Sequence, residues 1–573
     1  MTAITEVERP DASTERDADS LVVSGLNVSF TRGGQRHHVV HDLSFELPRG
    51  ACVAIVGESG SGKSVTARSI VGLAGDGSHV TSDALRLGGQ DISSLSSREW
   101  RGIRGKRIGF ILQDALVSLD PLRPVGREIE ESLALHGWGD RASRKRKAIE
   151  LLASVGVPLP EQRAKQRPDE LSGGLRQRAL IASALALDPE VIIADEPTTA
   201  LDVTVQAQVL GLLEETKRRG VSIVLISHDL SVVAQLADSI LVMKGGHIVE
   251  QGDTRQILER PRHPYTRGLI AAVPGEDTRG KRLGPDVEIV ATPHPQQLAG
   301  ELRDYRGPVL EATGLVKRFG TPGGGSQLAV DNVSFDLARG ETLGIVGESG
   351  SGKSTTGRIA LALTKPDAGA VRLLGQDWSS ESEPRRRRLR SRISVVYQDP
   401  LGSFDPRWNT ERILIDAVPH EAYPTAEGKR SRVRELLEQV GLAEDVLQRF
   451  PFRLSGGQRQ RIAIARALAP SPSVIVLDEA VSALDVSVQA QILDLLTGLQ
   501  KQLGLSYLFI SHDLGVIGHL SDRVLVMKDG AVVEHGTVEQ IFHSPQHAYT
   551  RELIGSLPSL ESETSGPTIR RHP

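Results

Sequence analysis

The sequence predicts an α/β fold that is written twice in one chain, as two tandem domains that each contain a mostly parallel sheet. Short apolar runs rich in β-branched residues alternate with helical patterns, which is typical of buried parallel strands. These runs are VAIVG, VIIADE and VSIVLISHD in the first half and LGIVG, VIVLDE and SYLFISHD in the second. The chain has 573 residues, which is more than one hydrophobic core usually serves.

A set of short motifs recurs in the same order in both halves, which indicates a duplicated domain rather than a solenoid of short repeats. The repeated motifs are GESGSGKS (57–64 and 347–354), LSGG (171–174 and 454–457), ADE and LDE (194–196 and 477–479), and ISHDL (226–230 and 510–514).

The positions of these motifs suggest the domain boundaries. We expect a first domain at 21–273 and a second at 308–558. Residues 274–307 are rich in proline, glycine and charge and are interpreted as a linker. The polar ends, 1–20 and 559–573, are predicted to be disordered tails.

Composition excludes several classes of protein. The 68 Lys and Arg residues nearly balance the 72 Asp and Glu residues, so no overall basic footprint for nucleic acid is present. The single cysteine, Cys52, permits neither an internal disulfide nor a four-cysteine metal site. No secretory signal is predicted, and no apolar run approaches the roughly 18 residues needed to cross a bilayer. A transport function would therefore need other chains to form the pore.

The octapeptide GESGSGKS fits the phosphate-binding loop of P-loop NTPases, because it follows a predicted strand and precedes a predicted helix. Its glycines allow backbone amides to turn toward phosphate oxygens, assisted by the helix N-terminus. Lys63 is expected to reach the β- and γ-phosphates of ATP and Ser64 to bind Mg²⁺. Lys353 and Ser354 repeat these roles. A merely structural glycine-rich turn is the alternative, and the second copy argues against it.

Two carboxylates end the apolar runs VIIADE and VIVLDE, one pair in each half. Asp195 and Asp478 fit the acid that holds Mg²⁺, and Glu196 and Glu479 fit the group that orients and deprotonates the attacking water. A structural acid pair at a strand end would be the interpretation of either pair taken alone.

The sequences LSGGLRQR and LSGGQRQR resemble the signature of the ABC ATPase family. This resemblance implies a helical subdomain in each domain and an internal head-to-tail pairing of the two domains. ATP would lie between the phosphate loop of one domain and the signature of the other, where a helix N-terminus offers a second anion site. Leu175 departs from the usual glutamine after LSGG.

Further residues match the family pattern. Gln113 and Gln398 resemble the glutamine that senses Mg²⁺ and the transport partner, and His228 and His512 resemble the switch histidine at the γ-phosphate. Phe30 and Phe319 lie where the family stacks an aromatic ring on adenine, although each could be an ordinary strand aromatic.

The predicted site residues form three groups. The catalytic candidates are Glu196, Glu479, His228 and His512. The ATP-binding candidates are Gly57, Glu58, Ser59, Gly60, Ser61, Gly62, Lys63, Ser64, Gly347, Glu348, Ser349, Gly350, Ser351, Gly352, Lys353, Ser354, Ser172, Gly173, Gly174, Ser455, Gly456, Gly457, Phe30 and Phe319. The Mg²⁺ candidates are Ser64, Gln113, Asp195, Ser354, Gln398 and Asp478.

Both halves close on a similar segment, RPRHPYTRGLIAAVP at Arg260–Pro274 and SPQHAYTRELIGSLP at Ser544–Pro558. These segments resemble those of ATPases from dipeptide, oligopeptide and nickel importers, and we interpret them as family markers that pack a helix end. The resemblance implies two membrane permeases and an extracytoplasmic solute-binding protein as partners, no nucleic acid, and a position on the cytoplasmic face of the bacterial membrane. No iron–sulfur cluster is predicted, because residues 274–307 contain no cysteine.

A soluble twin-ATPase of translation or DNA repair is the alternative function. The closing segments, the absence of zinc-binding cysteines and the proline-containing linker argue against it. The run Arg385–Arg388 is interpreted as a solvated loop rather than a lipid or nucleic-acid site.

Overall fold

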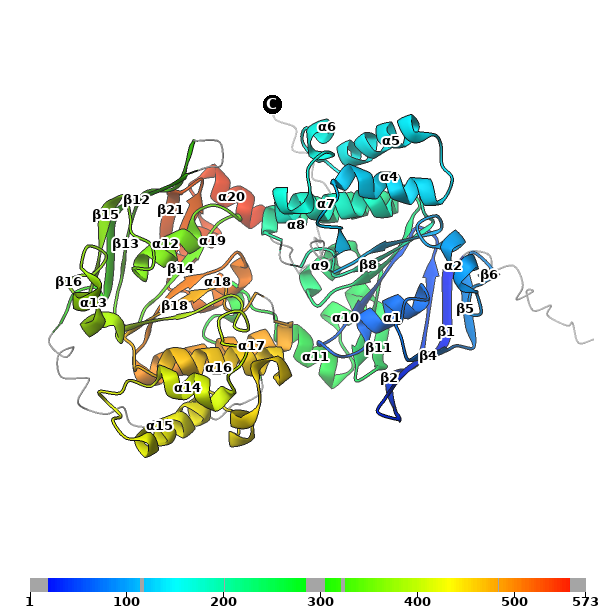
Figure 1. Cartoon of the computed structure of the whole chain (residues 1–573). Coiled ribbons are helices and arrows are strands. Elements are labelled where there is room, and N and C mark those ends of the chain that lie inside the picture. Colours follow the sequence, from blue (N-terminus) through cyan, green and yellow to red (C-terminus); the bar gives the residue numbers. More distant parts are fainter. Residues whose placement is uncertain are drawn as a thin grey trace, which may run out of the picture. The chain divides into compact units, whose positions relative to one another are not determined.

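The computed structural model describes residues 19–113, 118–199, 201–284, 305–320, 325–482 and 484–556. Their contacts divide them into two compact units, which we call the first and second domains. The first domain comprises the described residues of 19–201 and 205–270, and the second those of 202–204 and 271–556. Figure 1 shows the first domain in blue to green and the second in green to red.

The main sheet of the first domain has six strands in the order β11-β10-β3-β9-β8-β7. All neighbours are parallel except the edge strand β11, which pairs antiparallel with β10. The strands are β3 (Cys52–Val56), β7 (Ile108–Ile111), β8 (Val191–Asp195), β9 (Ser222–Ile226), β10 (Ser239–Lys244) and β11 (His247–Asp253). Every residue of β3, β8 and β9 is buried, as the continuous apolar runs predict for parallel strands covered on both faces.

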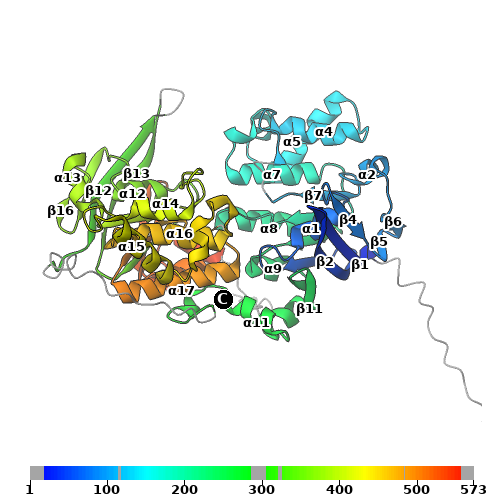
Figure 2. The same cartoon turned by 60° about the horizontal axis from the view of Figure 1, so that its bottom comes forward.

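A second, antiparallel sheet in the first domain has the order β2-β1-β5-β6, with β4 also paired to β1. Its strands are β1 (Asp19–Arg32), β2 (Gln35–Pro48), β4 (Ser78–Thr81), β5 (Ala84–Leu87) and β6 (Gln90–Asp91). The helices are α1 (Lys63–Ile70), α2 (Ser97–Ile103), α4 (Val125–Leu135), α5 (Arg141–Ser154), α6 (Pro160–Arg163), α7 (Gly173–Ala184), α8 (Val203–Arg218), α9 (Leu230–Leu236), α10 (Thr254–Glu259) and α11 (Pro264–Ala271). Helices α4, α5 and α7 pack together as a helical subdomain (Figure 2).

The second domain repeats this plan. Its main sheet has the order β17-β18-β19-β14-β20-β21, and its antiparallel sheet the order β13-β12-β15-β16. The strands are β12 (Leu310–Gly320), β13 (Ser326–Leu337), β14 (Thr342–Val346), β15 (Ala368–Leu373), β16 (Gln376–Asp377), β17 (Ile393–Val396), β18 (Val474–Asp478), β19 (Ser506–Ile510), β20 (Arg523–Lys528) and β21 (Ala531–Thr537).

The helices of the second domain follow the same order. They are α12 (Lys353–Ala360), α13 (Glu383–Arg390), α14 (Thr410–Ala417), α15 (Ala426–Gln439), α16 (Gly456–Leu468), α17 (Val486–Leu503), α18 (Leu514–Leu520), α19 (Val538–His543) and α20 (Ala548–Gly555), preceded by a short 3₁₀ helix, η2 (Glu276–Thr278). Helices α14, α15 and α16 form the helical subdomain. The predicted fold class is confirmed in both halves.

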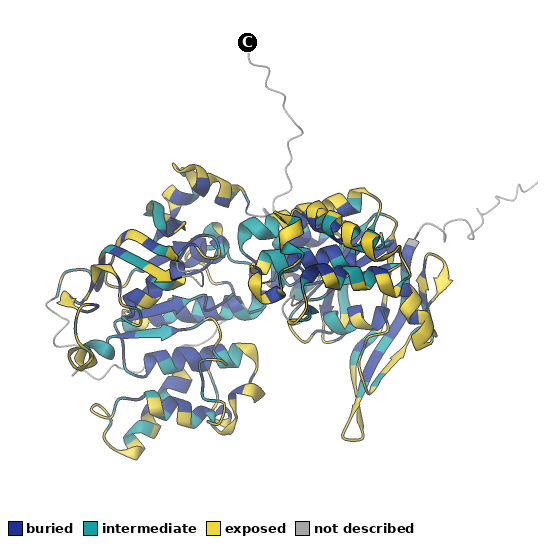
Figure 3. Cartoon of the chain, turned by 45° about the horizontal axis from the view of Figure 1, so that its top comes forward, coloured by how far each residue is buried: buried dark blue, intermediate teal, exposed yellow. Residues whose placement is uncertain are grey.

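Burial follows the strands in each domain, and the central strands are largely dark blue in Figure 3. The core of the first domain joins the two sheets through residues such as Leu21, Ile55 and Ile193, and that of the second through Leu310, Ile345 and Val476. Cys52 is fully buried in β3, where it packs as a small apolar side chain.

The structure also bears on the arginine run, the linker, the tails and the absence of a membrane span. Arg385–Arg388 lies in helix α13 and not in a loop, and Arg386 and Arg390 donate to the carbonyl oxygens of Ala362 and Leu361. Most of the predicted linker and tails lies outside the described residues, apart from Asp19 and Ser20, which begin β1, and linker residues 274–284 and 305–307. Among the helices that the structure describes, none is long and apolar enough to span a bilayer.

Candidate functional site

The phosphate-loop sequence connects a buried strand to a helix in each domain. In the first domain it follows β3 and enters α1 at Lys63. Gly57 has φ +151°, and a Cβ there would lie 2.2 Å from the carbonyl oxygen of Met243. Gly347 has φ +148°, with the same obstruction at 2.1 Å from Met527. Only glycine fits where this loop passes the end of the neighbouring strand.

The loop lysine folds back over its own loop. Nζ of Lys63 donates to the carbonyl oxygens of Gly57, at 2.7 Å, and Glu58, at 2.9 Å. Lys353 makes the same two bonds, both at 2.7 Å, to Gly347 and Glu348. Burial lowers the pKa of Lys353, while nearby carboxylates, Glu479 first, oppose that shift. Each domain therefore holds a buried ammonium group inside a loop of backbone amides, which is a site for an anion.

Ser64 and Asp195 form the predicted Mg²⁺ pair. The hydroxyl of Ser64 donates to Oδ1 of Asp195 at 2.9 Å, and Ser354 donates to Asp478 at 3.0 Å. Asp195 is fully buried, and its Oδ2 has no hydrogen-bond partner among the described residues. Burial raises the pKa of Asp195. A buried carboxylate oxygen without a donor, next to a hydroxyl, fits a hard cation such as Mg²⁺.

No cluster of three or more His, Cys, Asp or Glu side chains capable of holding a metal occurs in the part of the chain that the structure describes.

Glu196 lies at the centre of a hydrogen-bonded group. Nε2 of Gln113 donates to its Oε2 at 2.8 Å, and the hydroxyl of Thr199 donates to the same oxygen at 3.0 Å. Nδ1 of His228 lies 3.3 Å from Oε1. Burial alone would raise the pKa of Glu196, but the interactions with His228, Thr199 and Lys63 together outweigh it and lower the pKa. The contact with Glu196 raises the pKa of His228 against the opposing effect of its burial.

Glu479 keeps the glutamine and histidine contacts in the second domain, whereas the hydroxyl of Ser482 donates to its backbone carbonyl oxygen and not to its carboxylate. Gln398 donates to Oε2 at 2.7 Å, and Nδ1 of His512 lies 3.4 Å from Oε1. Both glutamates have a left-handed backbone, with φ of 51° at Glu196 and 50° at Glu479. This conformation is strained for a side chain of this size and is often kept at functional sites. In each domain the structure thus brings together the predicted glutamine, glutamate and histidine.

The signature residues lie at the N-termini of α7 and α16. Ser172 and Ser455 are the N-cap residues, and both are exposed together with the glycine that follows. An exposed helix N-terminus with free amides can bind a phosphate.

The two predicted adenine-stacking residues differ. Phe30 packs partly against the core of the first domain, as the alternative of an ordinary strand aromatic expects. Phe319 is 45% exposed, and Nζ of Lys317 lies 5.6 Å from the centre of its ring. Of these two side chains, only Phe319 is exposed to solvent.

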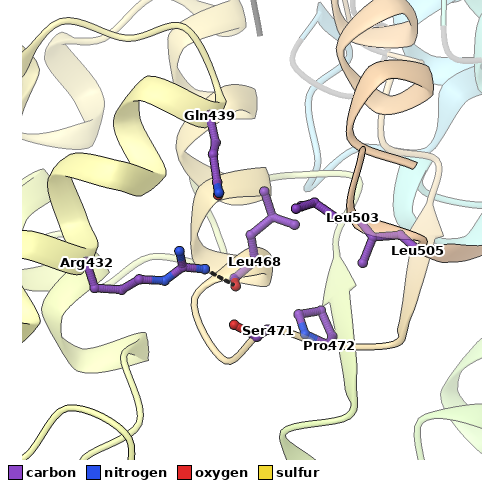
Figure 4. Close-up of a pocket in the computed structure, with 7 residues that line it drawn as sticks. All are labelled: Arg432, Gln439, Leu468, Ser471, Pro472, Leu503 and Leu505. Carbon is purple, nitrogen blue, oxygen red and sulfur yellow. Dashed lines mark hydrogen bonds between the residues drawn. The ribbon is translucent and has the colours of Figure 1, made fainter. Parts of the chain in front are cut away.

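A small cavity in the second domain is not the nucleotide site. It lies beside α15, α16 and the start of β19, and Figure 4 shows its lining. Its volume of about 10 Å³ suits roughly one water molecule. Arg432 donates across it to the carbonyl oxygen of Leu468 at 3.2 Å. The cavity is a packing gap between the helical subdomain and the sheet.

Sequence reasoning missed one residue at each phosphate loop. The hydroxyl of Tyr265 accepts the backbone N–H of Glu58 at 3.1 Å, and Tyr549 accepts that of Glu348 at the same distance. The two tyrosines belong to the HPYT and HAYT sequences, which were interpreted as packing markers. Their recurrence at the same place in both halves was the available signal.

Comparison with known proteins identifies relatives of this chain. The family model described as "ABC transporter" matches residues 40–199 and 330–482. The model "Oligopeptide/dipeptide transporter, C-terminal region" matches residues 249–296 and 533–573. The glutathione import ATP-binding protein GsiA of Escherichia coli (strain K12) is 42% identical over 577 residues, covering 97% of this chain and 92% of that protein. The GsiA protein of Salmonella paratyphi A is 42% identical over 574 residues with the same coverage.

Among solved structures, a dimeric bacterial ABC transporter cassette is 30% identical and covers 40% of this chain and 98% of its own, with a TM-score of 0.37.

Proposed function

This chain belongs to the ATP-binding proteins of ABC transporters, and we propose that it is the ATP-hydrolysing subunit of an importer for peptides or a related small solute such as glutathione. The observation that carries the proposal is the presence of two full sets of site residues. Each domain has a phosphate loop, a buried Ser–Asp pair and a glutamate held by glutamine and histidine.

The chemistry follows from the side chains of each domain. The loop amides and Lys63 would bind the β- and γ-phosphates of ATP, and Ser64 and Asp195 would hold Mg²⁺, which neutralises charge on the transferred phosphoryl group. Glu196, with its lowered pKa, is ionised at neutral pH and can accept a proton from the attacking water. Gln113 and His228 fix its two oxygens in place. Lys353, Ser354, Asp478, Glu479, Gln398 and His512 take the same roles in the second domain.

The signature serines and glycines complete the proposal. In the family, the signature of one domain contributes its helix N-terminus to the ATP bound by the other. We therefore assign Ser455, Gly456 and Gly457 to the ATP held by Lys63. Ser172, Gly173 and Gly174 are assigned to the ATP held by Lys353. ATP binding would then draw the halves together and hydrolysis would release them, because closure adds contacts to the γ-phosphate.

The substrate class rests on relatives. The C-terminal family model concerns oligopeptide and dipeptide transporters, and the GsiA relatives are described as glutathione import proteins. Import of such solutes needs two permeases and an extracytoplasmic binding protein, and this chain would act on the cytoplasmic face of the membrane. A twin-ATPase of translation or repair has no observation in its favour here, since the relatives that match almost the whole chain are import proteins.

Replacing both catalytic glutamates tests the proposal. The variant Glu196→Gln with Glu479→Gln keeps the hydrogen-bonding shape but removes the proton acceptor, so ATP hydrolysis should fall by about 10²- to 10⁴-fold while ATP still binds. Steady-state phosphate release and nucleotide-binding titrations measure the two effects, and uptake of glutathione and dipeptides by cells carrying the variant should stop.

The exposed Glu46 of β2 offers a matched control. Glu46→Gln should hydrolyse ATP at the rate of the unaltered protein. Undiminished hydrolysis in the double glutamate variant would refute the catalytic assignment.

A further inference from the structure

The closing segment of each domain contacts the phosphate loop of the same domain through a tyrosine. The phenol oxygen of Tyr265, on α11, accepts the N–H of Glu58, the second residue of the loop. In the second domain, Tyr549 on α20 accepts the N–H of Glu348. We propose that Tyr265 and Tyr549 are positioning residues of the two ATP sites, which hold the phosphate loops in their ATP-binding shape. This inference rests on the proposed function and assigns a role to segments otherwise interpreted as packing.

The turn that leads into each tyrosine is held by three hydrogen bonds from backbone N–H groups to side chains. Glu250 on β11 accepts the N–H groups of Arg262, at 2.8 Å, and His263, at 3.0 Å. Nδ1 of His263 then accepts the N–H of Tyr265 at 3.1 Å and caps the helix that carries it. Burial opposes the charged form of Glu250, but the hydrogen bonds it accepts, those from the two backbone amides among them, outweigh this effect and lower its pKa to about 2. The carboxylate therefore stays charged and keeps the turn fixed near neutral pH.

The second domain reproduces every link of this chain. Glu534 on β21 accepts the N–H groups of Gln546, at 2.7 Å, and His547, at 2.9 Å. Nδ1 of His547 accepts the N–H of Tyr549 at 3.2 Å. Arg262 and Gln546 differ in side chain, yet both contribute only their backbone N–H to the glutamate. The glutamate, the histidine and the tyrosine, whose side chains make these contacts, are the same in both copies.

A lysine ammonium group lies over the face of each tyrosine ring. Nζ of Lys244, the last residue of β10, lies 4.6 Å from the ring centre of Tyr265. Nζ of Lys528, the last residue of β20, lies 4.4 Å from that of Tyr549. Cation–π contacts at this distance favour one ring orientation. Burial raises the pKa of Tyr549 to about 12, so the phenol remains neutral under physiological conditions.

The residue that the tyrosine holds is also bound by the lysine of the phosphate loop. The carbonyl oxygen of Glu58 accepts from Nζ of Lys63 at 2.9 Å, and its N–H is accepted by Tyr265. The Glu58 residue is thus fixed at both of its backbone polar groups, and with it the direction of the loop that follows Gly57. The loop must have this shape both for bound ATP and for the transition state, so the tyrosine should contribute to nucleotide affinity more than to the chemical step.

Removing the two hydroxyl groups tests the inference. In the full chain, Tyr265→Phe with Tyr549→Phe keeps both rings and leaves the N–H groups of Glu58 and Glu348 without their acceptor. We expect the KM for ATP and the Kd for a fluorescent ADP analogue to rise about five- to thirtyfold, with kcat changed by less than about twofold. Hydrogen exchange of the peptides that contain Glu58 and Glu348 should become faster in the absence of nucleotide.

Tyr507→Phe is the matched control for loss of a buried phenol hydroxyl. Tyr507 is fully buried in β19, and its hydroxyl donates to the carbonyl oxygen of Leu496 at 2.9 Å. This variant should lose stability without changing KM or the ADP affinity. If the double phenylalanine variant behaves in the same way, with lower stability and unchanged nucleotide affinity, the tyrosines only pack the helix end and the inference is wrong.

The two proposals fail in different ways. An unaltered protein that binds the ADP analogue but does not hydrolyse ATP would contradict the proposed function, and the binding titration would still decide the role of the tyrosines. Normal hydrolysis in the unaltered protein, with equal KM and Kd in the double phenylalanine variant, would overturn only the present inference.

Discussion

Helices α9 and α18 occupy the same place in the two copies of the fold, yet among the residues that the structure describes a docked segment of chain lies only on α18. Their sequences are LSVVAQL and LGVIGHL. The 3₁₀ helix η2 and the residues around it pack on α18. A Cβ on Gly515 would lie 2.7 Å from the carbonyl oxygen of Pro274, and one on Gly518 would lie 3.2 Å from the nitrogen of Glu276. The first domain has Ser231 and Ala234 at these positions, so close approach of a chain is possible only in the second.

Polar contacts complete this docking. Nδ1 of His519 is hydrogen bonded to the hydroxyl of Thr278 at 2.9 Å. Asp494 on α17 accepts the N–H of Leu283 at 3.1 Å and that of Gly284 at 2.8 Å. The aligned helices VTVQAQVLGLL and VSVQAQILDLL place Gly211 where the second domain has Asp494. Gly515, Gly518, His519 and Asp494 are therefore features of the second copy alone.

Asp238 and Asp522 occupy the same place in the two domains but pair with different cations. In the first domain, Asp238 accepts the N–H of Cys52 and pairs with Lys217 on α8. In the second, Asp522 accepts the N–H of Thr342 and pairs with Arg279 of the docked segment at 2.7 Å. The catalytic groups differ far less: the Gln–Glu distances are 2.8 and 2.7 Å, and the His–Glu distances are 3.3 and 3.4 Å. The two copies diverged at the surface that holds the connecting chain and stayed alike where chemistry is expected.

The largest effect should come from altering the catalytic glutamates one at a time. Because the two constellations have the same geometry, Glu196→Gln and Glu479→Gln should lower ATP hydrolysis by the same factor, within about twofold. The reason is that each change removes the same proton acceptor, which is worth about 10²- to 10⁴-fold at its own site. Steady-state phosphate release from each purified variant measures this. Strong inhibition by one change and none by the other would show that the sites are not equivalent.

A smaller effect should follow from removing the docking acceptor. Asp494→Ala leaves the N–H groups of Leu283 and Gly284 without their carboxylate, which should lower the free energy of unfolding of the second domain by about 1–2 kcal/mol. Urea denaturation measures the loss, and proteolysis within residues 275–284 should become faster.

The first domain supplies the control for this prediction. Gly211 is exposed, and a Cβ there would meet nothing within 4 Å, so Gly211→Ala should stabilise α8 by up to about 1 kcal/mol and leave the docked segment unaffected. Equal protease resistance of Asp494→Ala and the unaltered protein would contradict the importance of the docking contacts.

Features with a local cause were predictable from sequence. The strand–loop–helix around Lys63 follows from an apolar run, glycines at positions that exclude a Cβ, and a helix that starts at the lysine. The acid pair at the end of β8 was predictable because the two carboxylates directly follow a continuous apolar run. Family resemblance added Gln113 and His228, although their contacts with Glu196 depend on strands that are distant in sequence.

Features set by tertiary packing were not predictable. Tyr265 lies far along the chain from Glu58, and nothing in HPYT indicates that the phenol reaches the phosphate loop. The sequence PGEDTRGKRLG has the composition of a linker. The packing of this segment on α18 depends on Gly515 and Gly518, and Asp494 on α17 binds its end. Nothing in the local sequence of either helix indicates these contacts.

The smallest effect concerns the residue after LSGG, where the two signature helices differ. In α16, the hydroxyl of Ser455 accepts the N–H of Gln458 at 3.2 Å, and Oε1 of Gln458 accepts the N–H of Ser455 at 3.1 Å. This reciprocal pair is a capping box, and α7 has Leu175 in place of the glutamine and no side-chain cap from Ser172. Leu175→Gln should therefore stabilise the start of α7 by about 0.5–1 kcal/mol, and Gln458→Leu should weaken the start of α16 by a similar amount.

Hydrogen exchange at the first turn of α7 and α16 measures this pair of changes. Exchange should be slower in Leu175→Gln and faster in Gln458→Leu. A helix end whose N–H groups are hydrogen bonded unfolds locally less often, so its amides exchange more slowly. A loss of protection in Leu175→Gln would mean that Leu175, which is partly buried, stabilises α7 more through apolar contact than a capping glutamine can. The difference between the two signature helices would then be an alternative way of securing the same helix start.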